Sequence, residues 1–133
     1  MSTRWVNIGA GGTPGPPTSD TIYDIIFSLY GLPQANIVMP WLTFVRQVDF
    51  DANFLDSKGT VGVNPTAQKT FTLTKNGSPA GTIVVATNGV VTFTTTGGIA
   101  IQFLAGDRLE ITTPTTQDST LRDVAFTLKG LWS

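Results

Sequence analysis

Apolar and polar residues alternate through residues 68–113, and short turn sequences interrupt the alternation several times. Phe71 and Leu73 alternate with threonines, and this period of two places the apolar side chains on one face of a strand. Asn-Gly dipeptides at 76–77 and 88–89 indicate tight turns, because both residues tolerate the positive φ that such turns need. The pattern predicts short antiparallel strands at 70–74, 82–86, 90–94, 99–103 and 109–111.

Further strands are predicted on either side of this stretch. Residues 21–30 fit two interpretations, since their apolar residues match both a helical stripe and a period of two. We favour a strand there, because the other predicted elements are strands and local preferences usually agree with the fold. Residues 41–50 predict one long strand whose apolar face includes Arg46, either as a charge at the sheet rim or as a paired contact between subunits. Residues 51–67 predict a long loop, and residues 121–128 predict the closing strand.

The number of predicted strands indicates the fold class. A chain of 133 residues suits one domain, and about eight antiparallel strands in two packed sheets are typical of a jelly roll. The expected fold is all-β: an antiparallel two-sheet β-sandwich of about eight strands, jelly-roll-like, with an extended N-terminal leader. The leader is expected to cover residues 1–19, and the single sandwich domain residues 20–133.

The leader is rich in glycine and proline. Residues 9–17 form three consecutive Gly-X-Y triplets, the collagen pattern in which only glycine fits at the axis of three wound chains. Three triplets are too few to hold a triple helix alone, so the segment is either a semi-extended linker or lies beside other chains or in a partner's groove. Trp5 precedes it, and a tryptophan on a short leader is costly to leave in water. We therefore expect the leader to dock on its own domain or on a partner.

Composition excludes several classes of function. Only 13% of the residues are charged, the net charge is −1, and the eight basic residues are scattered, so the chain lacks the basic stripe that nucleic-acid binding needs. Cysteine and histidine are absent, which removes thiol chemistry and the usual general base. P-loop, dinucleotide-binding and Gly-x-Ser-x-Gly motifs are missing as well. We therefore expect a protein that is not an enzyme and holds no cofactor or metal.

The sequence also bears on membranes and export. It has no apolar stretch near the ~20 residues of a membrane span, and its N-terminal residues lack the apolar core of a secretory signal. We therefore expect no membrane insertion, and a protein that stays in a cytosol or leaves it by lysis.

Apolar residues in the leader and in long loops are the remaining candidates for a contact surface. The predicted loop at 51–67 exceeds the usual length of a connection, and loops that long often make contacts. Aromatic residues on the surface would stack on sugars or become buried between subunits. The aromatic candidates are Trp5, Tyr23, Tyr30, Trp41 and Trp132. The predicted assembly contacts are Trp5, Val6, Ile8, Pro14, Pro16, Pro17, Phe54, Leu55 and Trp132.

Four strand-and-turn segments carry a resemblance to a known family: residues 44–54, 71–83, 103–109 and 120–130. They are similar to the small all-β, jelly-roll-like domains that recur in structural proteins of tailed-bacteriophage and prophage virions, often after collagen-like stretches. The collagen-like part is much shorter here than in a long fibre. These segments contain turns and strands without catalytic residues, so the resemblance bears more on the fold and setting than on a particular role.

The resemblance implies a virion structural protein that assembles from identical copies, with a trimer as the expected homo-oligomer. The preferred role is a tail fibre or tail-attachment component that takes part in host adsorption, with a host surface glycan as a partner. One alternative is a capsid decoration protein that stabilises the head, its leader reaching other virion proteins. A further alternative is a non-viral carbohydrate-binding β-sandwich module. The expected location is the virion, after assembly in the host cytoplasm and release by lysis.

Overall fold

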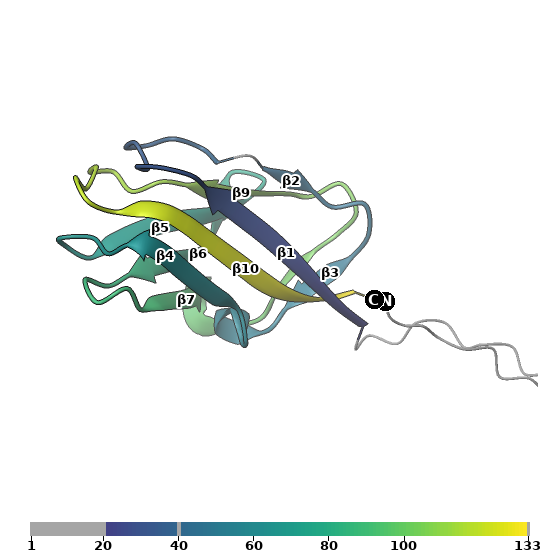
Figure 1. The fold of residues 1–133 in the computed structure, drawn as a ribbon. Coiled ribbons are helices and arrows are strands. Elements are labelled where there is room, and N and C mark those ends of the chain that lie inside the picture. The colour runs from purple at the N-terminus through teal and green to yellow at the C-terminus, as the bar shows by residue number, and fades with distance from the viewer. Residues whose placement is uncertain (1–20, 40, 133) are drawn as a thin grey trace, which may run out of the picture.

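A computed structural model describes residues 21–39 and 41–132, which form two antiparallel sheets packed face to face (Figure 1). The leader, with the predictions made for it, lies outside the described residues. The elements are β1 (Thr21–Leu29), β2 (Leu42–Thr43), β3 (Val48–Phe50), η1 (Ala52–Phe54), β4 (Lys58–Val63), β5 (Lys69–Lys75), β6 (Ser78–Val85), β7 (Val91–Thr95), η2 (Thr96–Gly98), β8 (Ile101–Phe103), β9 (Arg108–Thr112) and β10 (Arg122–Trp132).

The order of the strands is that of a jelly roll. One sheet runs β1-β10-β3-β8, with β4 also pairing with β10, and the other runs β2-β9-β5-β6-β7. Counted from the two ends of the chain toward its middle, β1 pairs with β10, β2 with β9, β3 with β8 and β5 with β6, while β4 lies beside β7. The chain is thus one long hairpin wrapped around a core, which confirms the expected all-β, antiparallel, jelly-roll-like sandwich.

The described strands number ten, and the first reason is that the predicted long strand at 41–50 is broken. β2 belongs to one sheet and β3 to the other, so the chain crosses between the sheets at Phe44. Phe44 is buried, its ring centroid lies 4.8 Å from that of Phe103, and its backbone N–H donates to the Asp107 carbonyl. The prediction of a single strand is wrong because this ring fills the core at the crossing, whereas a straight strand would have kept to one sheet.

The second reason is that residues 51–67 contain η1 and β4, so the prediction of a long loop there is wrong. β4 includes two glycines, which normally weaken a strand and hid it in the sequence. A Cβ on Gly59 would lie 2.7 Å from Cγ1 of Val91, so glycine at this position lets β4 approach β7 closely. Close packing between the two sheets thus outweighs the poor strand propensity of glycine.

Residues 21–29 form a strand, β1, as favoured from the sequence. It pairs with β10 along its whole length, from Thr21 opposite Trp132 to Leu29 opposite Val124. Its Ile25 side chain is buried, as expected for a strand with one face on the core.

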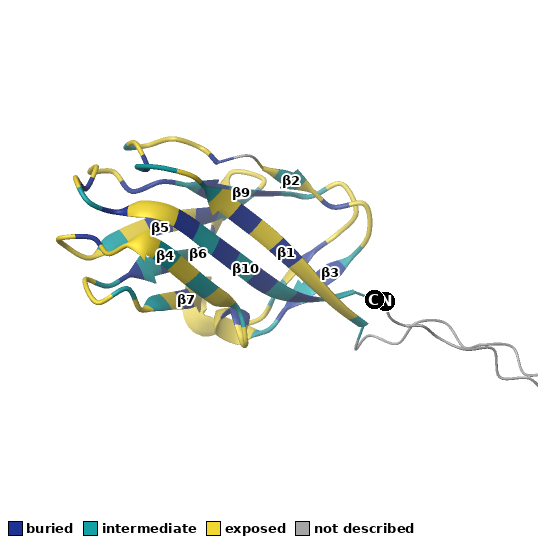
Figure 2. Ribbon diagram, viewed as in Figure 1, coloured by how far each residue is buried: buried dark blue, intermediate teal, exposed yellow. Residues whose placement is uncertain are grey.

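Buried and exposed residues alternate along β1 (Figure 2). Among the described residues, phenylalanine fills the core, whereas tyrosine and tryptophan lie nearer the surface. The chain has eight phenylalanines, and every one is buried. Their rings meet mostly edge to face, as between Phe71 and Phe126, whose centroids lie 5.0 Å apart. By contrast, Tyr30 is 93% exposed and Trp41 57% exposed. The buried aromatic residues are therefore all phenylalanines. The described tyrosines and tryptophans, whose rings carry a polar atom, lie at or near the surface, where they can make contacts.

Candidate functional site

The outer edge of β1 along residues 22–29 is the longest open strand edge among the described residues. Within the described part of the chain, β1 is the terminal strand of its sheet, and β10 is the strand that pairs with it. β1 contains no proline, lysine, arginine or bulge, which are features that commonly protect an edge from pairing with another chain, and Asp24 is its one charged residue. The other edge strands among the described residues are shorter, with two residues in β2, three in β8, five in β7 and six in β4.

A groove of about 450 Å³ runs along this edge, between β1 and the segment that leads into β2. Residues 23–28 form one wall, and Met39, Trp41 and Leu42 form the other. Met39 is buried and its backbone N–H donates to the carbonyl of Ile111, which fixes this wall to β9. The groove is thus lined by both apolar and polar residues, and Asp24 and Ser28 are the polar ones on the β1 side.

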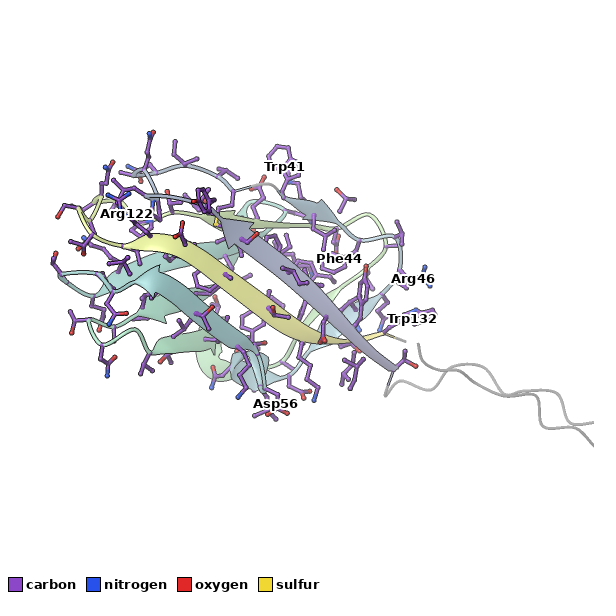
Figure 3. All side chains as sticks on the ribbon, viewed as in Figure 1. Trp41, Phe44, Arg46, Asp56, Arg122 and Trp132 are labelled. Carbon is purple, nitrogen blue, oxygen red and sulfur yellow. The ribbon has the colours of Figure 1, made fainter. Side chains whose placement is uncertain are left out.

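Trp41 projects from the rim of the groove (Figure 3). The guanidinium carbon of Arg108 lies 4.7 Å from the centroid of its ring, and Nε of Arg108 lies 3.0 Å from Oε2 of Glu110. This stacked contact holds the indole in place although 57% of the residue is exposed. An aromatic ring held in this way offers contact area at a low entropic cost.

The solvent-facing side of β1 combines two exposed aliphatic residues with a carboxylate. Ile22 is 59% exposed and Ile26 is 72% exposed, and Asp24 lies between them. Lys129 lies opposite Asp24 in the register, but its Nζ pairs with Oδ2 of Asp56 at 3.2 Å. Asp24 therefore has no ion pair among the described residues. We call Ile22, Tyr23, Asp24, Ile26 and Trp41, with the groove beside them, the β1 edge surface.

Three of the predicted assembly contacts lie within the described residues, and the structure separates them. Leu55 is 57% exposed after η1, and Trp132 is partly exposed at the end of β10. Phe54 is only 1% exposed, so its assignment as an assembly contact is wrong. The other predicted contacts, Trp5, Val6, Ile8, Pro14, Pro16 and Pro17, lie outside the described residues.

A local backbone turn explains why Phe54 faces inward. Asn53 has a positive φ of 56°, and its N–H donates to Oγ1 of Thr95 while its Oδ1 accepts the N–H of Thr95. This reciprocal pair anchors η1 to the end of β7. The turn directs the Phe54 ring against Phe50, with the ring centroids 5.3 Å apart. The sequence predicts a surface contact for Phe54 because it is an apolar residue in a turn, whereas its ring packs in the core.

Asp118 is the clearest buried carboxylate, and its surroundings are structural. Oδ2 accepts hydrogen bonds from N and Oγ1 of Thr66, and Oδ1 accepts from the N–H groups of Thr120 and Leu121. The hydroxyl of Thr66 and the N–H of Thr120 hold the pKa of Asp118 well below its usual range. The Asp118 carboxylate thus joins the β4–β5 connection to the start of β10. Because it is ionised and its oxygens already accept hydrogen bonds, it is unsuited to act as a general acid or base.

The two ends of the sandwich differ. Thr21 and Trp132 pair at one end, where the chain enters and leaves the described domain (Figure 1). The connections at residues 30–37, 64–68 and 113–121 lie at the opposite end, which we call the distal end. Hydrogen bonds join them there: the N–H of Gly31 donates to Oδ1 of Asp123, and Oγ1 of Thr120 donates to the carbonyl of Asn64.

Within residues 21–39 and 41–132, no three acidic residues gather where they could hold a metal ion. Over the same ranges, no helix has the length and apolar character needed to cross a bilayer. Sequence reasoning named Tyr23 and Trp41 as aromatic candidates, but it missed Asp24, Ile26 and Met39. The available signal was a nine-residue strand without proline or a basic residue; only the sheet order shows that its edge is open.

Comparison of the chain with protein-family models, with curated proteins and with solved structures found no match in any of the three.

Proposed function

We propose that this protein is a non-enzymatic structural protein of a tailed-bacteriophage virion, serving in a tail fibre or tail-attachment component during host adsorption. The proposal is supported by the resemblance of residues 44–54, 71–83, 103–109 and 120–130 to virion domains, together with the jelly-roll order of the strands. Jelly rolls are common in viral structural proteins, although a fold by itself does not assign a function.

The observation that carries the proposal is the placement of the two ends of the domain. Thr21 and Trp132 pair at one end, and the Gly/Pro-rich segment 9–17 precedes Thr21 in sequence. A domain held from that end presents its distal end outward, as a knob on a stalk does. Tyr30 lies just beyond β1 at the distal end and is 93% exposed, and an exposed aromatic ring can stack on a sugar.

Capsid decoration is the second candidate, and the β1 edge surface favours it. A decoration protein must hold neighbouring copies together, and the open edge along residues 22–29, with the groove beside it, offers a place for such a contact. A tail component built from several copies needs the same kind of contact, so location on the particle distinguishes the two roles.

Immunogold electron microscopy of intact particles, with an antibody against the described domain, tests the proposal. We expect label at the tail end. Label spread over the head would assign the protein to decoration, and absence of label from every particle would overturn a virion role and favour the free carbohydrate-binding module.

Binding of purified protein to host surface polysaccharide tests the attachment role more closely. Tyr30→Ala should weaken binding by at least about tenfold if the distal end meets the glycan, since stacking aromatics are typical hot spots. Ile99→Ala is the matched control, because Ile99 is also well exposed, at 66%. Ile99 precedes β8, which lies at the opposite edge of the sheet from β1. Equal binding by wild type and Tyr30→Ala would exclude the distal end as the receptor site.

A further inference from the structure

We propose that the β1 edge surface receives residues 4–8 from the leader of a second copy of this chain, which add to the sheet as an extra strand beside β1. The inference identifies the partner for the assembly role proposed above, and it rests on that role only for its biological setting. An extended segment that pairs with an open sheet edge gains backbone hydrogen bonds, and side-chain pockets give it specificity.

The first argument is the open edge itself. Every second residue of an open edge has its backbone N–H and C=O groups facing outward, and a long edge without protection tends to pair with another chain. Ile22 and Ile26 add exposed aliphatic area on the solvent-facing side of β1. A strand laid along the edge would pack against this exposed area and would border the groove beside Trp41.

The second argument is that the leader has the complementary pattern. In an extended strand, Arg4, Val6 and Ile8 share one side and Trp5 takes the other. One side then presents a cation followed by two aliphatic residues, so that with Arg4 opposite the carboxylate of Asp24, Val6 lies opposite one of its two isoleucine neighbours on the solvent-facing side of β1. The opposite side presents the Trp5 indole to the groove.

The third argument concerns which copy supplies the leader. Residues 9–20 carry three prolines and four glycines, and twelve residues in a fully extended polyproline conformation would span up to about 37 Å at about 3.1 Å per residue. β1 itself is about 30 Å long at about 3.3 Å per residue. A connecting length greater than that of β1 is enough for residues 4–8 to reach the open edge of a neighbouring copy. Donation from each copy to the next is a head-to-tail contact, which closes into a ring when the rotation permits, as in the expected trimer.

Sedimentation velocity over a concentration series of the purified full chain tests the pairing. We expect concentration-dependent association, weakened at least about tenfold by Trp5→Ala, which removes the anchor, and by Ile26→Lys, which protects the edge with a charge. Ile99→Lys is the control, because it changes a similarly exposed residue away from β1. Each variant should keep the wild-type thermal transition, since the sites within the described domain are exposed.

The proposal would be overturned if the wild type were monomeric, or if either Trp5→Ala or Ile26→Lys associated as tightly as the wild type. It would also be overturned if the control Ile99→Lys weakened association to the same extent. These results concern contact between purified copies, whereas immunogold labelling concerns the virion role, so either idea can fail without the other.

A charge-reversal experiment tests donation between copies. Arg4→Asp and Asp24→Arg should each weaken association when alone, because each places like charges together. An equal mixture of the two variants should associate more tightly than either one alone, since a leader of one variant then finds an edge of opposite charge on the other variant. In a ring of three copies, at least one of the three contacts still joins like charges, so the recovery is partial. Exposed pairs are weak, so the recovery is expected to be about two- to fivefold at low salt. Failure of the mixture to recover would overturn donation between copies.

Discussion

The guanidinium carbon of Arg46 lies 4.3 Å from the centroid of the Trp132 ring. This contact ties the bend between β2 and β3 to the last residues of β10, at the end of the sandwich where the chain enters and leaves (Figure 3). Arg46 is exposed, so its charge stays in water while its planar group covers the indole. The geometry agrees with a charge at the rim of the sheet, one of the two interpretations that the sequence allowed.

A double-mutant cycle measures this contact. Arg46→Ala and Trp132→Ala should show a coupling free energy of about 0.5–1 kcal/mol in denaturant unfolding, as expected for an exposed cation–π pair. Arg122→Ala with Trp132→Ala is the control cycle, because Arg122 lies at the opposite end of β10 (Figure 3). The control should be additive, and equal coupling in both cycles would contradict a specific Arg46–Trp132 contact.

Asp118 should make the protein sensitive to acid. Its folded-state pKa is lowered by the hydroxyl of Thr66 and by backbone N–H groups, so its stabilisation is complete above the unfolded pKa of about 3.9. That stabilisation is lost as the pH falls from about 4 through the folded pKa. Asp118→Asn should therefore lower the free energy of unfolding at pH 7 and flatten its dependence on pH below 4. Urea unfolding at pH 7, 4 and 2 checks this, and parallel pH profiles for the two proteins would contradict it.

Asp123 should show a graded response to substitution. It has a positive φ of 57°, its Oδ1 accepts the N–H of Gly31 at 2.6 Å, and its own N–H donates to the Gly31 carbonyl. Asparagine keeps an acceptor and tolerates this conformation, glycine keeps only the conformation, and alanine keeps neither. Thermal unfolding should give the stability order wild type, Asn, Gly, Ala, with about 1 kcal/mol between Gly and Ala. An alanine variant as stable as the glycine variant would contradict it.

Neighbouring residues 54 and 55 should separate core packing from surface contact. Phe54→Ala should cost about 3–5 kcal/mol in the free energy of unfolding, because it removes a fully buried ring next to Phe50. Leu55→Ala should stay within about 0.5 kcal/mol, because its side chain is mostly in water. Denaturant unfolding measures both changes, and similar losses for the two variants would contradict the burial difference.

Much of the fold is local and could be predicted from the sequence. Alternating Phe71 and Leu73 identified β5, and both are completely buried. The dipeptide Asn76-Gly77 has φ values of 51° and 87°, as a tight hairpin between β5 and β6 requires. Such features depend on a few neighbouring residues. The sequence alone therefore determined the strands between residues 69 and 112 and the all-β class.

The tertiary structure decided what depends on distant partners. Phe44 interrupts a segment that alternates like one strand, because the core that buries its ring is built by residues as remote as Phe103. Gly59 lies in a strand because the sheet packing demands a close approach to Val91. The open edge beside Ile26 exists only because β10, a hundred residues later in the chain, pairs with the other edge of β1. Alternation determines which face of a strand is apolar, but the order of strands in a sheet is set by long-range packing, and that order decides which edge remains free to bind.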